Sequence, residues 1–529
     1  MLFRSPIEDL GNATPDELAA VVASQMGFVR KRLPGQSLVD VFNPSLDEDG
    51  WESQHTVIEL ANEDKPFLVN TANMAVAELN LGVHLMVHPV MHVERDAGGE
   101  VVGYFAPEVG RGQPESIIHM QVDRQNDPEV LLRIKAKLEG AMRDVSVAVE
   151  DWRSILEKAS EAIRELPDWA AVVSPERVEE TRDFLSWMCD NHFLFLGMRD
   201  YEVKHDEGQS CLAVVEGSGL GLLRESERTV MRRPLTTLSE SARLNQDDPL
   251  IITKTRSRST VHRVGYMDYI GVLRFDAEGN TVGERRFIGL FTSNAYFRRA
   301  LDTPLLRRKI KDVLERSGVS SGSHAYKALV HILETLPRDD VFQATVEELT
   351  DIAMAVLNLQ ERRMVRLLVR QERFSRFYSC LVFLPRDQSS TENRENIQRI
   401  LFNAYQGERI DYNISVSDSL LARLKFVIRP KAGCEPQPDV RQLEQKIVDT
   451  VRSWTDALRD ILVQKHGEDT GLRWAADIGE AFPAAYVEDV SPWVASFDVQ
   501  RIAELDGSDD LGMSLYRPRR RDTDIIRFK

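Results

Sequence analysis

The sequence predicts a multidomain protein of the α+β class. At about 150 residues per domain, its 529 residues favour three or four domains. The order strand, helix, strand, strand, helix occurs twice, in residues 52–165 and again in residues 371–510. This order is that of a ferredoxin-like βαββαβ-type sandwich. Because the two copies share little residue identity, the repeat is one of architecture.

Residues 1–51 are expected to form an N-terminal helical arm. Thr14 and Glu17 have the spacing of a capping box, in which each residue's side chain bonds the other's backbone N–H. Pro15 stands at the first helical position, where its missing N–H costs nothing. The sequence therefore predicts that a helix begins at Pro15.

The first sandwich, residues 52–165, is predicted from alternating and helix-spaced apolar patterns. Strand-like alternation is found in "HTVIEL", in "GVHLMVHPVMHVERD" and in "SIIHMQVDR". A helix is expected in "PFLVNTANMAVAELN", with Asn80 and Gly82 as its stop signal. From Asp127 onward, apolar residues at heptad-like spacing predict a long second helix.

The middle of the chain, residues 170–300, predicts a PAS-like α+β domain. Ser174 and Pro175 open a helix, and about five strand-like runs follow it. The turn "DAEGN" between the last two runs is typical of a hairpin. Periodicity alone leaves the strand order of this domain open.

Residues 301–370 predict a helical segment, with a capping box at Thr345 and Glu348. The second sandwich, residues 371–510, includes trailing helices, and its last part is expected to begin with one long helix in "DVRQLEQKIVDTVRSWTDALRDILVQKHG". Residues 511–529 end in "IIRFK", which resembles the start of a strand. We expect this segment to be the start of a truncated third sandwich.

Charge and hydropathy exclude several classes of partner. The net charge of -17 repels phosphate backbones, and the only dense basic cluster is "RPRRRD" at 517–522, so no nucleic acid partner is expected. No apolar run reaches the 18 or more residues of a membrane span. The first residues carry acids where a secretory signal needs a basic segment. The sequence therefore predicts a cytoplasmic protein without a membrane partner.

Two motifs that resemble ligand sites are better explained by structure. His84, His88 and His92 are four residues apart, but the apolar residues between them alternate, and on a strand this spacing separates them by roughly 13 Å. They cannot share one metal ion, and no other metal site is expected. The segment "GSGLGLL", residues 217–223, lacks the third glycine of a dinucleotide fingerprint and is predicted to be a loop.

A basic stripe is predicted on one strand face by Lys254, Arg256 and Arg258, with His262 following at the same spacing. One interpretation is a solvated face that pairs with nearby acids. The other is a subunit contact or an anion site. The sequence does not decide between them.

The loop "NEDKPFLV", residues 62–69, resembles the signature of ACT domains, small-molecule sensors that commonly bind amino acids. Asp64, Lys65 and Pro66 match that signature, and Phe67 stands where its glycine is expected. The resemblance makes Asn62, Asp64 and Lys65 candidate effector-binding residues. A phenylalanine side chain can fill the space in which a ligand would approach the backbone at the helix start.

Longer runs extend this resemblance over nearly the whole chain. The runs "FLVNTANMAVAELNLGVHLMVHPV", "SRSTVHRVGYMDYIGVLRFDAEGNTVGERRFIGLFTSNAY" and "GSHAYKALVHILETLPRDDVFQ" are similar to the N-terminal region of the large bacterial NAD-dependent glutamate dehydrogenases. The resemblance implies two ACT-like domains, a PAS-like domain and helical segments ahead of a catalytic domain. It also implies a homo-oligomer, a tetramer, in which this region contacts its own catalytic domain and other subunits. It further implies allosteric regulation by a metabolite or amino acid.

The catalytic parts of such an enzyme are missing from the sequence. No Gly-Gly-x-Lys motif occurs, and the only Gly-Gly pair, Gly98 and Gly99, precedes Glu100 and Val101. We therefore expect no catalytic residue, and no cofactor in this chain, with NAD bound elsewhere in the parent enzyme. The alternative hypothesis is a free-standing ACT-type amino-acid sensor. A third hypothesis, that the chain is itself a dehydrogenase, requires that it produce NADH from glutamate.

Overall fold

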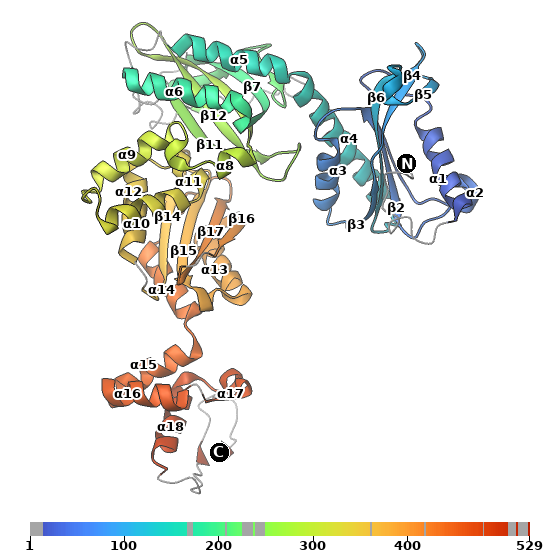
Figure 1. Ribbon diagram of the computed structural model, residues 1–529. Helices are drawn as coiled ribbons and strands as arrows, with labels where there is room; N and C mark the ends of the chain where they lie inside the picture. The colour runs from blue at the N-terminus through green and yellow to red at the C-terminus, as the bar shows by residue number, and fades with distance from the viewer. Residues whose placement is uncertain are drawn as a thin grey trace. The chain divides into compact units, whose positions relative to one another are not determined.

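A computed structural model describes residues 14–166, 173–206, 209–224, 236–237, 249–359, 362–416, 419–479, 481–505, 515–516 and 527–528 (Figure 1). The chain divides into two compact units, Met1–Met354 and Ala355–Lys529. Each unit is described by itself below.

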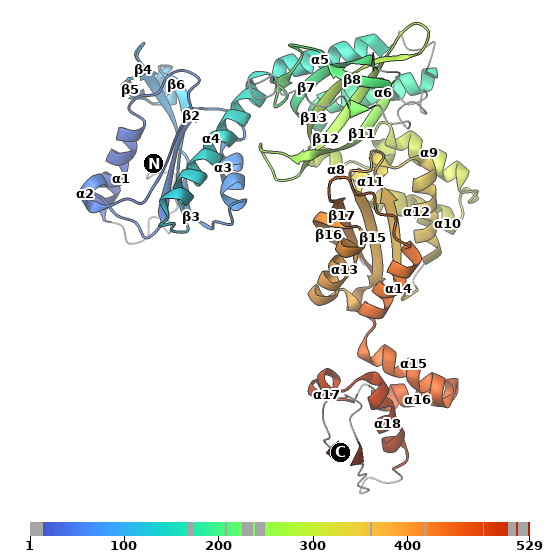
Figure 2. The same cartoon turned by 180° about the vertical axis from the view of Figure 1, so that it is seen from behind.

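The first unit begins with an antiparallel six-stranded sheet in the order β1-β2-β6-β4-β5, with β3 also paired to β6. Its strands are β1 (Leu38–Phe42), β2 (Thr56–Glu63), β3 (Val83–Val87), β4 (Val90–Arg95), β5 (Val101–Phe105) and β6 (Gln113–Val122). Its helices are α1 (Pro15–Phe28), α2 (Leu46–Asp49), α3 (Leu68–Ala77) and α4 (Pro128–Glu150). Helix α1 lies on one face of the sheet, and α3 and α4 lie on the other (Figure 2).

Local signals explain most of these elements. The capping box at the start of α1 is confirmed, because the N–H of Thr14 donates to Glu17 and the N–H of Glu17 donates to Thr14. Asp127 caps α4, and Pro89 separates β3 from β4. The prediction of a purely helical arm in residues 1–51 is wrong, because the segment also contains the edge strand β1.

The middle part of the first unit places two helices beside a second antiparallel sheet. The helices are α5 (Trp152–Glu165) and α6 (Pro175–Trp187). The strands, in the order β10-β8-β7-β13-β12-β11 with β9 paired to β7, are β7 (Phe193–Asp206), β8 (Gln209–Val214), β9 (Leu220–Gly221), β10 (Thr236–Thr237), β11 (Leu250–Arg258), β12 (Tyr266–Phe275) and β13 (Thr281–Phe291). The hairpin at "DAEGN" is confirmed, since β12 and β13 pair around it. The PAS-like assignment stays a prediction.

Five helices follow in residues 293–359. They are α8 (Ser293–Phe297), α9 (Leu306–Arg316), α10 (His324–Thr335), α11 (Arg338–Gln343) and α12 (Val346–Leu359). The capping box before α12 is confirmed by hydrogen bonds of 2.9 and 3.1 Å between Thr345 and Glu348.

The second unit contains a four-stranded antiparallel sheet in the order β14-β15-β17-β16. Its strands are β14 (Arg366–Gln371), β15 (Tyr378–Pro385), β16 (Gly407–Ser415) and β17 (Leu421–Pro430), and its helices are α13 (Thr391–Ala404), α14 (Val440–Val451), α15 (Trp454–His466), α16 (Glu468–Trp474), α17 (Ala484–Asp489) and α18 (Pro492–Ala503). The prediction of one long helix here is wrong. Arg452 is extended and Ser453 caps a new helix by accepting from the N–H of Asp456, so the helix is divided into α14 and α15.

The C-terminal predictions lie mostly outside the described residues. Strands β18 (Leu515–Tyr516) and β19 (Arg527–Phe528) pair with each other. The basic cluster at 517–522 is not among the described residues, so the expected third sandwich stays a prediction.

Candidate functional site

The loop between β2 and α3 separates the three candidate effector residues. Asn62, near the end of β2, is 3% exposed, and its amide nitrogen lies 3.8 Å from the sulfur of Met142 on α4. Its Oδ1 atom is buried and accepts no hydrogen bond from any described residue. Asp64 is exposed, and its backbone N–H donates to the carbonyl of Pro114 at 3.0 Å. The structure therefore brings Asn62 and Lys65 against α4 and leaves the Asp64 side chain in solvent.

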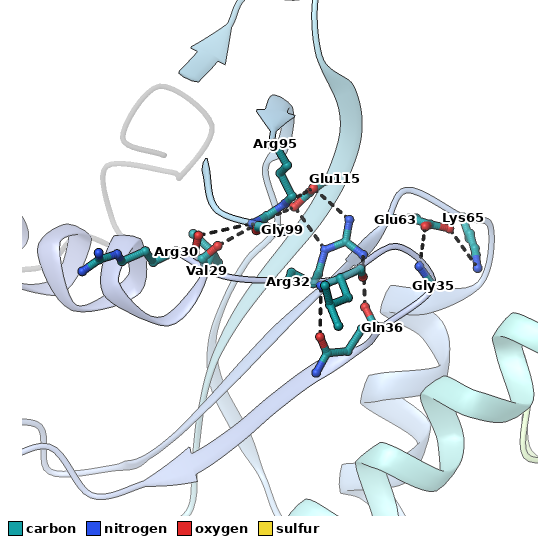
Figure 3. Close-up of polar contacts among 11 residues, drawn as sticks. Val29, Arg30, Arg32, Gly35, Gln36, Glu63, Lys65, Arg95, Gly99 and Glu115 are labelled. Carbon is teal, nitrogen blue, oxygen red and sulfur yellow. Dashed lines mark hydrogen bonds and ion pairs between the residues drawn. The ribbon is translucent and has the colours of Figure 1, made fainter. Parts of the chain in front are cut away.

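The ammonium group of Lys65 is surrounded by acceptors. Its Nζ lies 3.3 Å from Glu63, 3.4 Å from Glu150 and 3.5 Å from the hydroxyl of Ser146. A hydrogen bond from the N–H of Gly35, and the charge of Lys65, hold the pKa of Glu63 below its ordinary value (Figure 3). The charge of Lys65 is already balanced by these carboxylates, so its ammonium group is not a free partner for a ligand carboxylate.

Helix α3 begins without a side-chain cap. Phe67 occupies the N-cap position with a left-handed backbone, φ 75°, and makes no capping hydrogen bond. The glycine of the ACT signature would adopt this conformation without strain, so the local geometry of the signature is kept although the residue differs. Such a backbone is uncommon for a residue with a bulky side chain.

A loop of the middle part, residues 259–265, reaches the first turn of α3. The backbone N–H of His262 donates to the hydroxyl of Thr71 at 3.0 Å, and the imidazole ring centroid lies 5.1 Å from that of Phe67. Val261 is fully buried in the same core cluster as Leu68. The sequence contains no pattern that predicts this contact, because the contact joins residues nearly two hundred positions apart.

The 259–265 loop holds its own shape. Ser259 donates from its N–H to the carbonyl of Gly265 at 2.8 Å and from its hydroxyl to the carbonyl of Val261 at 2.7 Å. Burial, together with the charge of Arg263, lowers the pKa of His262 below its ordinary value. The ring is therefore favoured in its neutral form where it meets α3.

A second connection joins the effector loop to the glycine segment at 217–223. Glu150 lies between Lys65 and Arg224, whose Nη1 is 3.6 Å away. Arg224 also donates to Asp151 at 2.6 Å, and the N–H of Gly221 donates to the same carboxylate at 2.7 Å. Burial opposes ionisation of Asp151, but these hydrogen bonds outweigh it and lower the pKa of the carboxyl group.

On the other face of the first sheet, Glu115 is held between two arginines (Figure 3). Its side chain is 2% exposed and lies 2.8 Å from Arg32 and 2.7 Å from Arg95. Arg95 also donates to the carbonyls of Val29 at 3.0 Å and Gly99 at 2.8 Å. Every acceptor around this network belongs to the domain itself, so its role is to fasten the segment after α1 to the sheet.

A small cavity of about 170 Å³ lies between α3, α4 and the 259–265 loop. Its lining is mostly apolar and includes three charged side chains, those of Glu78, Lys137 and Asp144. The lining residues are Met74, Ala75, Glu78, Ala136, Lys137, Gly140, Ala141, Asp144 and Thr260. Burial raises the pKa of Asp144, although Thr260 hydrogen-bonds to it.

The basic stripe is only partly solvated. Lys254 is 16% exposed and lies 2.6 Å from Asp268 and 3.3 Å from Asp339. Burial opposes its charge, but these two carboxylates raise the pKa of Lys254 above its ordinary value. Burial raises the pKa of Asp268 to about 6. At Lys254 the expected pairing with nearby acids is confirmed, but the expectation of a solvated face is wrong there, because the lysine is 16% exposed and pairs internally.

Two of the three histidines, His84 and His88, make separate contacts. His84 lies 2.7 Å from Asp123 and stacks on His55, while His88 lies 2.7 Å from the hydroxyl of Ser116. Within the described part of the chain, no group of three or more His, Cys, Asp or Glu side chains is arranged to hold a metal ion. No helix in those same residues is both long and apolar enough to span a bilayer.

Four family models match the chain. They are described as the ACT1 domain of glutamate dehydrogenase over residues 1–138, its helical motif 1 over residues 303–362, its ACT2 domain over residues 366–455 and its helical motif 2 over residues 461–505. The two ACT models thus fall on the two predicted sandwiches.

Three similar proteins carry the name NAD-specific glutamate dehydrogenase. The protein from Halomonas elongata is 37% identical over 97% of this chain, and that from Pseudomonas aeruginosa is 33% identical over 97%. The protein from Mycobacterium tuberculosis is 27% identical over 95%. The matched part covers 32%, 32% and 31% of these relatives, so the chain spans about a third of their length.

Proposed function

Because the chain belongs to the glutamate dehydrogenase family represented by these ACT and helical-motif domains, we propose that it is the non-catalytic regulatory and oligomerisation region of a large NAD-dependent glutamate dehydrogenase. The whole enzyme would oxidatively deaminate L-glutamate to 2-oxoglutarate and ammonia and reduce NAD to NADH. The observation that carries the proposal is the match of two ACT domains and two helical motifs in one chain.

The residues of this chain do not fit NAD at the segment that most resembles a dinucleotide loop. A phosphate would need free backbone N–H groups there. Instead, the N–H of Gly221 is bonded to the carboxylate of Asp151. A Cβ atom at Gly219 would lie 2.2 Å from the carbonyl oxygen of Leu223, and one at Gly221 would lie 2.3 Å from that of Leu196. These glycines are therefore explained by close backbone packing, and we assign no NAD site to this segment.

The proposed effector site is the junction of β2 and α3. Helix α3 offers backbone N–H groups that no side chain caps, and these suit a carboxylate. The buried Oδ1 of Asn62 suits an ammonium group, and Lys65, held by Glu63 and Glu150, borders the same loop. This combination supports an amino acid as the effector, with Asn62 and Lys65 as the binding residues; the exposed Asp64 side chain has no contact among the described residues that supports a binding role.

Thermal-shift measurements on the 529-residue chain test the effector site. We expect at least one L-amino acid, added singly, to raise the melting temperature of the wild-type chain and to lose this effect in Lys65→Met. Lys135→Met is the matched control, because Lys135 lies on α4 of the same domain, is 36% exposed and pairs with Asp40. If no amino acid stabilises the chain, the sandwiches are architectural and the effector part of the proposal fails.

An activity assay tests the non-catalytic part of the proposal. The purified chain, given L-glutamate and NAD, is expected to produce no NADH, whereas the full-length parent enzyme does. Steady NADH production by the chain alone would overturn the proposal.

The oligomerisation part is supported by strand β16, which lies at the edge of its sheet. Tyr412 and Ile414 on this strand are 50% and 45% exposed, and the unpaired backbone groups of an edge strand can pair with another chain. Ile414→Lys is expected to lower the mass of the assembly in sedimentation experiments, with Val282→Lys, at a 42% exposed valine, as the control. An unchanged mass for Ile414→Lys would exclude this edge as a subunit contact.

A further inference from the structure

The first turn of α3 is approached by one segment from outside its own domain. Phe67 and Asn70 border the uncapped helix start, and both contact His262, whose ring centroid lies 5.1 Å from that of Phe67 and whose Nδ1 lies 3.5 Å from the Asn70 amide. Thr71, on the same turn, is fully buried and accepts the His262 N–H. The N-cap residue and two residues of the first turn of α3 are thus engaged by a single histidine.

The histidine is seated by an apolar anchor beside it. Val261 is 0% exposed and belongs to the core cluster that includes Leu68 and Ala72 of α3. Ser259, 1% exposed, closes the loop through its bonds to Gly265 and Val261. The 259–265 loop therefore docks as a preformed unit, with one buried side chain as its anchor.

The seam between the loop and the helices is incompletely filled. A cavity of about 170 Å³ is lined by Thr260 of the loop together with residues of α3 and α4. Because the loop closes through its own hydrogen bonds, it would keep its shape on leaving α3. Its departure would therefore sacrifice less packing than the loss of a close-packed contact.

We infer that the 259–265 loop is an internal latch that covers the start of α3 and competes with a small carboxylate-bearing ligand for that position. The inference rests on the proposed effector site, because it supplies the regulation of that site. When the loop is seated, the His262 ring and the Phe67 ring stand at the helix start. When the loop leaves, the N–H groups of the first turn become accessible to a carboxylate.

The latch is tested by hydrogen exchange, detected by mass spectrometry, on the 529-residue chain. Val261→Ser removes the apolar anchor, and Val282→Ser is the matched control because Val282 is 42% exposed on β13. We expect amides of residues 68–72 to exchange about tenfold faster in Val261→Ser, which corresponds to about 1.4 kcal/mol, and to be unchanged in Val282→Ser. Amides of residues 378–385, in the second unit, report whether the effect is local.

His262→Gly provides a second variant that keeps the core intact. Glycine freely adopts the left-handed backbone of His262, φ 72°, so this change removes the ring without disturbing the turn. We expect the wild-type chain to bind a stabilising L-amino acid more weakly than either latch variant does. Faster exchange with no amino acid bound by any of the proteins would support the latch and overturn the effector function. Unchanged exchange at residues 68–72 in both variants would overturn the latch.

Discussion

Replacing Lys254 by methionine should expose the cost of an unpaired buried carboxylate. Lys254 is 16% exposed and lies 2.6 Å from Asp268, whose side chain is 2% exposed. Breaking a buried ion pair on one side commonly costs roughly 3–5 kcal/mol. Because Asp268 can bind a proton once its cation is gone, we expect the lower end, about 3 kcal/mol. For a cooperative unit of about 150–250 residues, this loss corresponds to a melting temperature lower by about 6–12 °C.

The pH dependence gives this prediction its sign. Burial raises the pKa of Asp268 to about 6, above its ordinary value of 3.8, so the folded state binds more protons than the unfolded state between these values. The stability that this group gives is present at low pH and lost as the pH rises through about 6. Without Lys254 the pKa rises further, so the deficit of Lys254→Met should be larger at roughly pH 8 than at roughly pH 5.

Differential scanning calorimetry across this pH range is the assay. Lys204→Met is the control, because Lys204 is 58% exposed and its contact with Glu202 is worth less than about 1 kcal/mol. In Lys254→Met/Asp268→Asn the buried carboxylate of Asp268 is absent, and the deficit should become smaller and less dependent on pH. A deficit in Lys254→Met no larger than that of the control, or one that grows on acidification, would refute the reasoning.

Three further predictions concern the first unit. Gly140→Ala, at a helical position with no close neighbour, should raise the stability by about 0.5–1 kcal/mol, and a lower melting temperature would contradict this. Glu115→Gln should cost about 3–5 kcal/mol in a thermal unfolding experiment, because Arg32 and Arg95 stay buried. Burial opposes ionisation of Glu115, but hydrogen bonds from both arginines lower its pKa below 4.5. The stability that its carboxylate gives is therefore present above that pH and lost as the pH falls. Glu115→Gln should lack this loss of stability in acid. Burial lowers the pKa of His262 below 6.5, so the stability it gives is present above pH 6.5 and lost on acidification; exchange in residues 259–265, corrected for intrinsic rates, should accelerate there, and a flat profile would exclude this.

Elements with local signals could be predicted from the sequence. The helices that begin at Pro15, Pro128 and Val346 each have a capping residue directly before the first helical residue. The structure contains all three helices. The division between α14 and α15 also has a local signal, because Ser453 and Asp456 have the spacing of a helix start. The continuous apolar pattern across this point concealed it. Periodicity reports only which side of a helix is buried, and both helices bury theirs.

The site could be predicted only in part. The signature located the loop at Asn62 and Lys65, because backbone geometry and sequence are local there. The partners of these residues come from α4 and from the 259–265 loop, which are brought close only by tertiary packing. Strand β14 begins within residues 301–370, which are predicted to be helical. Its alternation is too short to indicate a strand, and its structure depends on pairing with β15.

Asp151 has a consequence for how motion can pass along the first unit. This residue ends α4 and begins α5, and its carboxylate also holds Gly221 and Arg224. An α-helix of the length of α4, 23 residues, is about 35 Å long and resists bending. Because Lys65 meets Glu150, the residue next to Asp151, a small rotation imposed there would act directly beside the glycine segment and would displace the distant Pro128 end of α4 most.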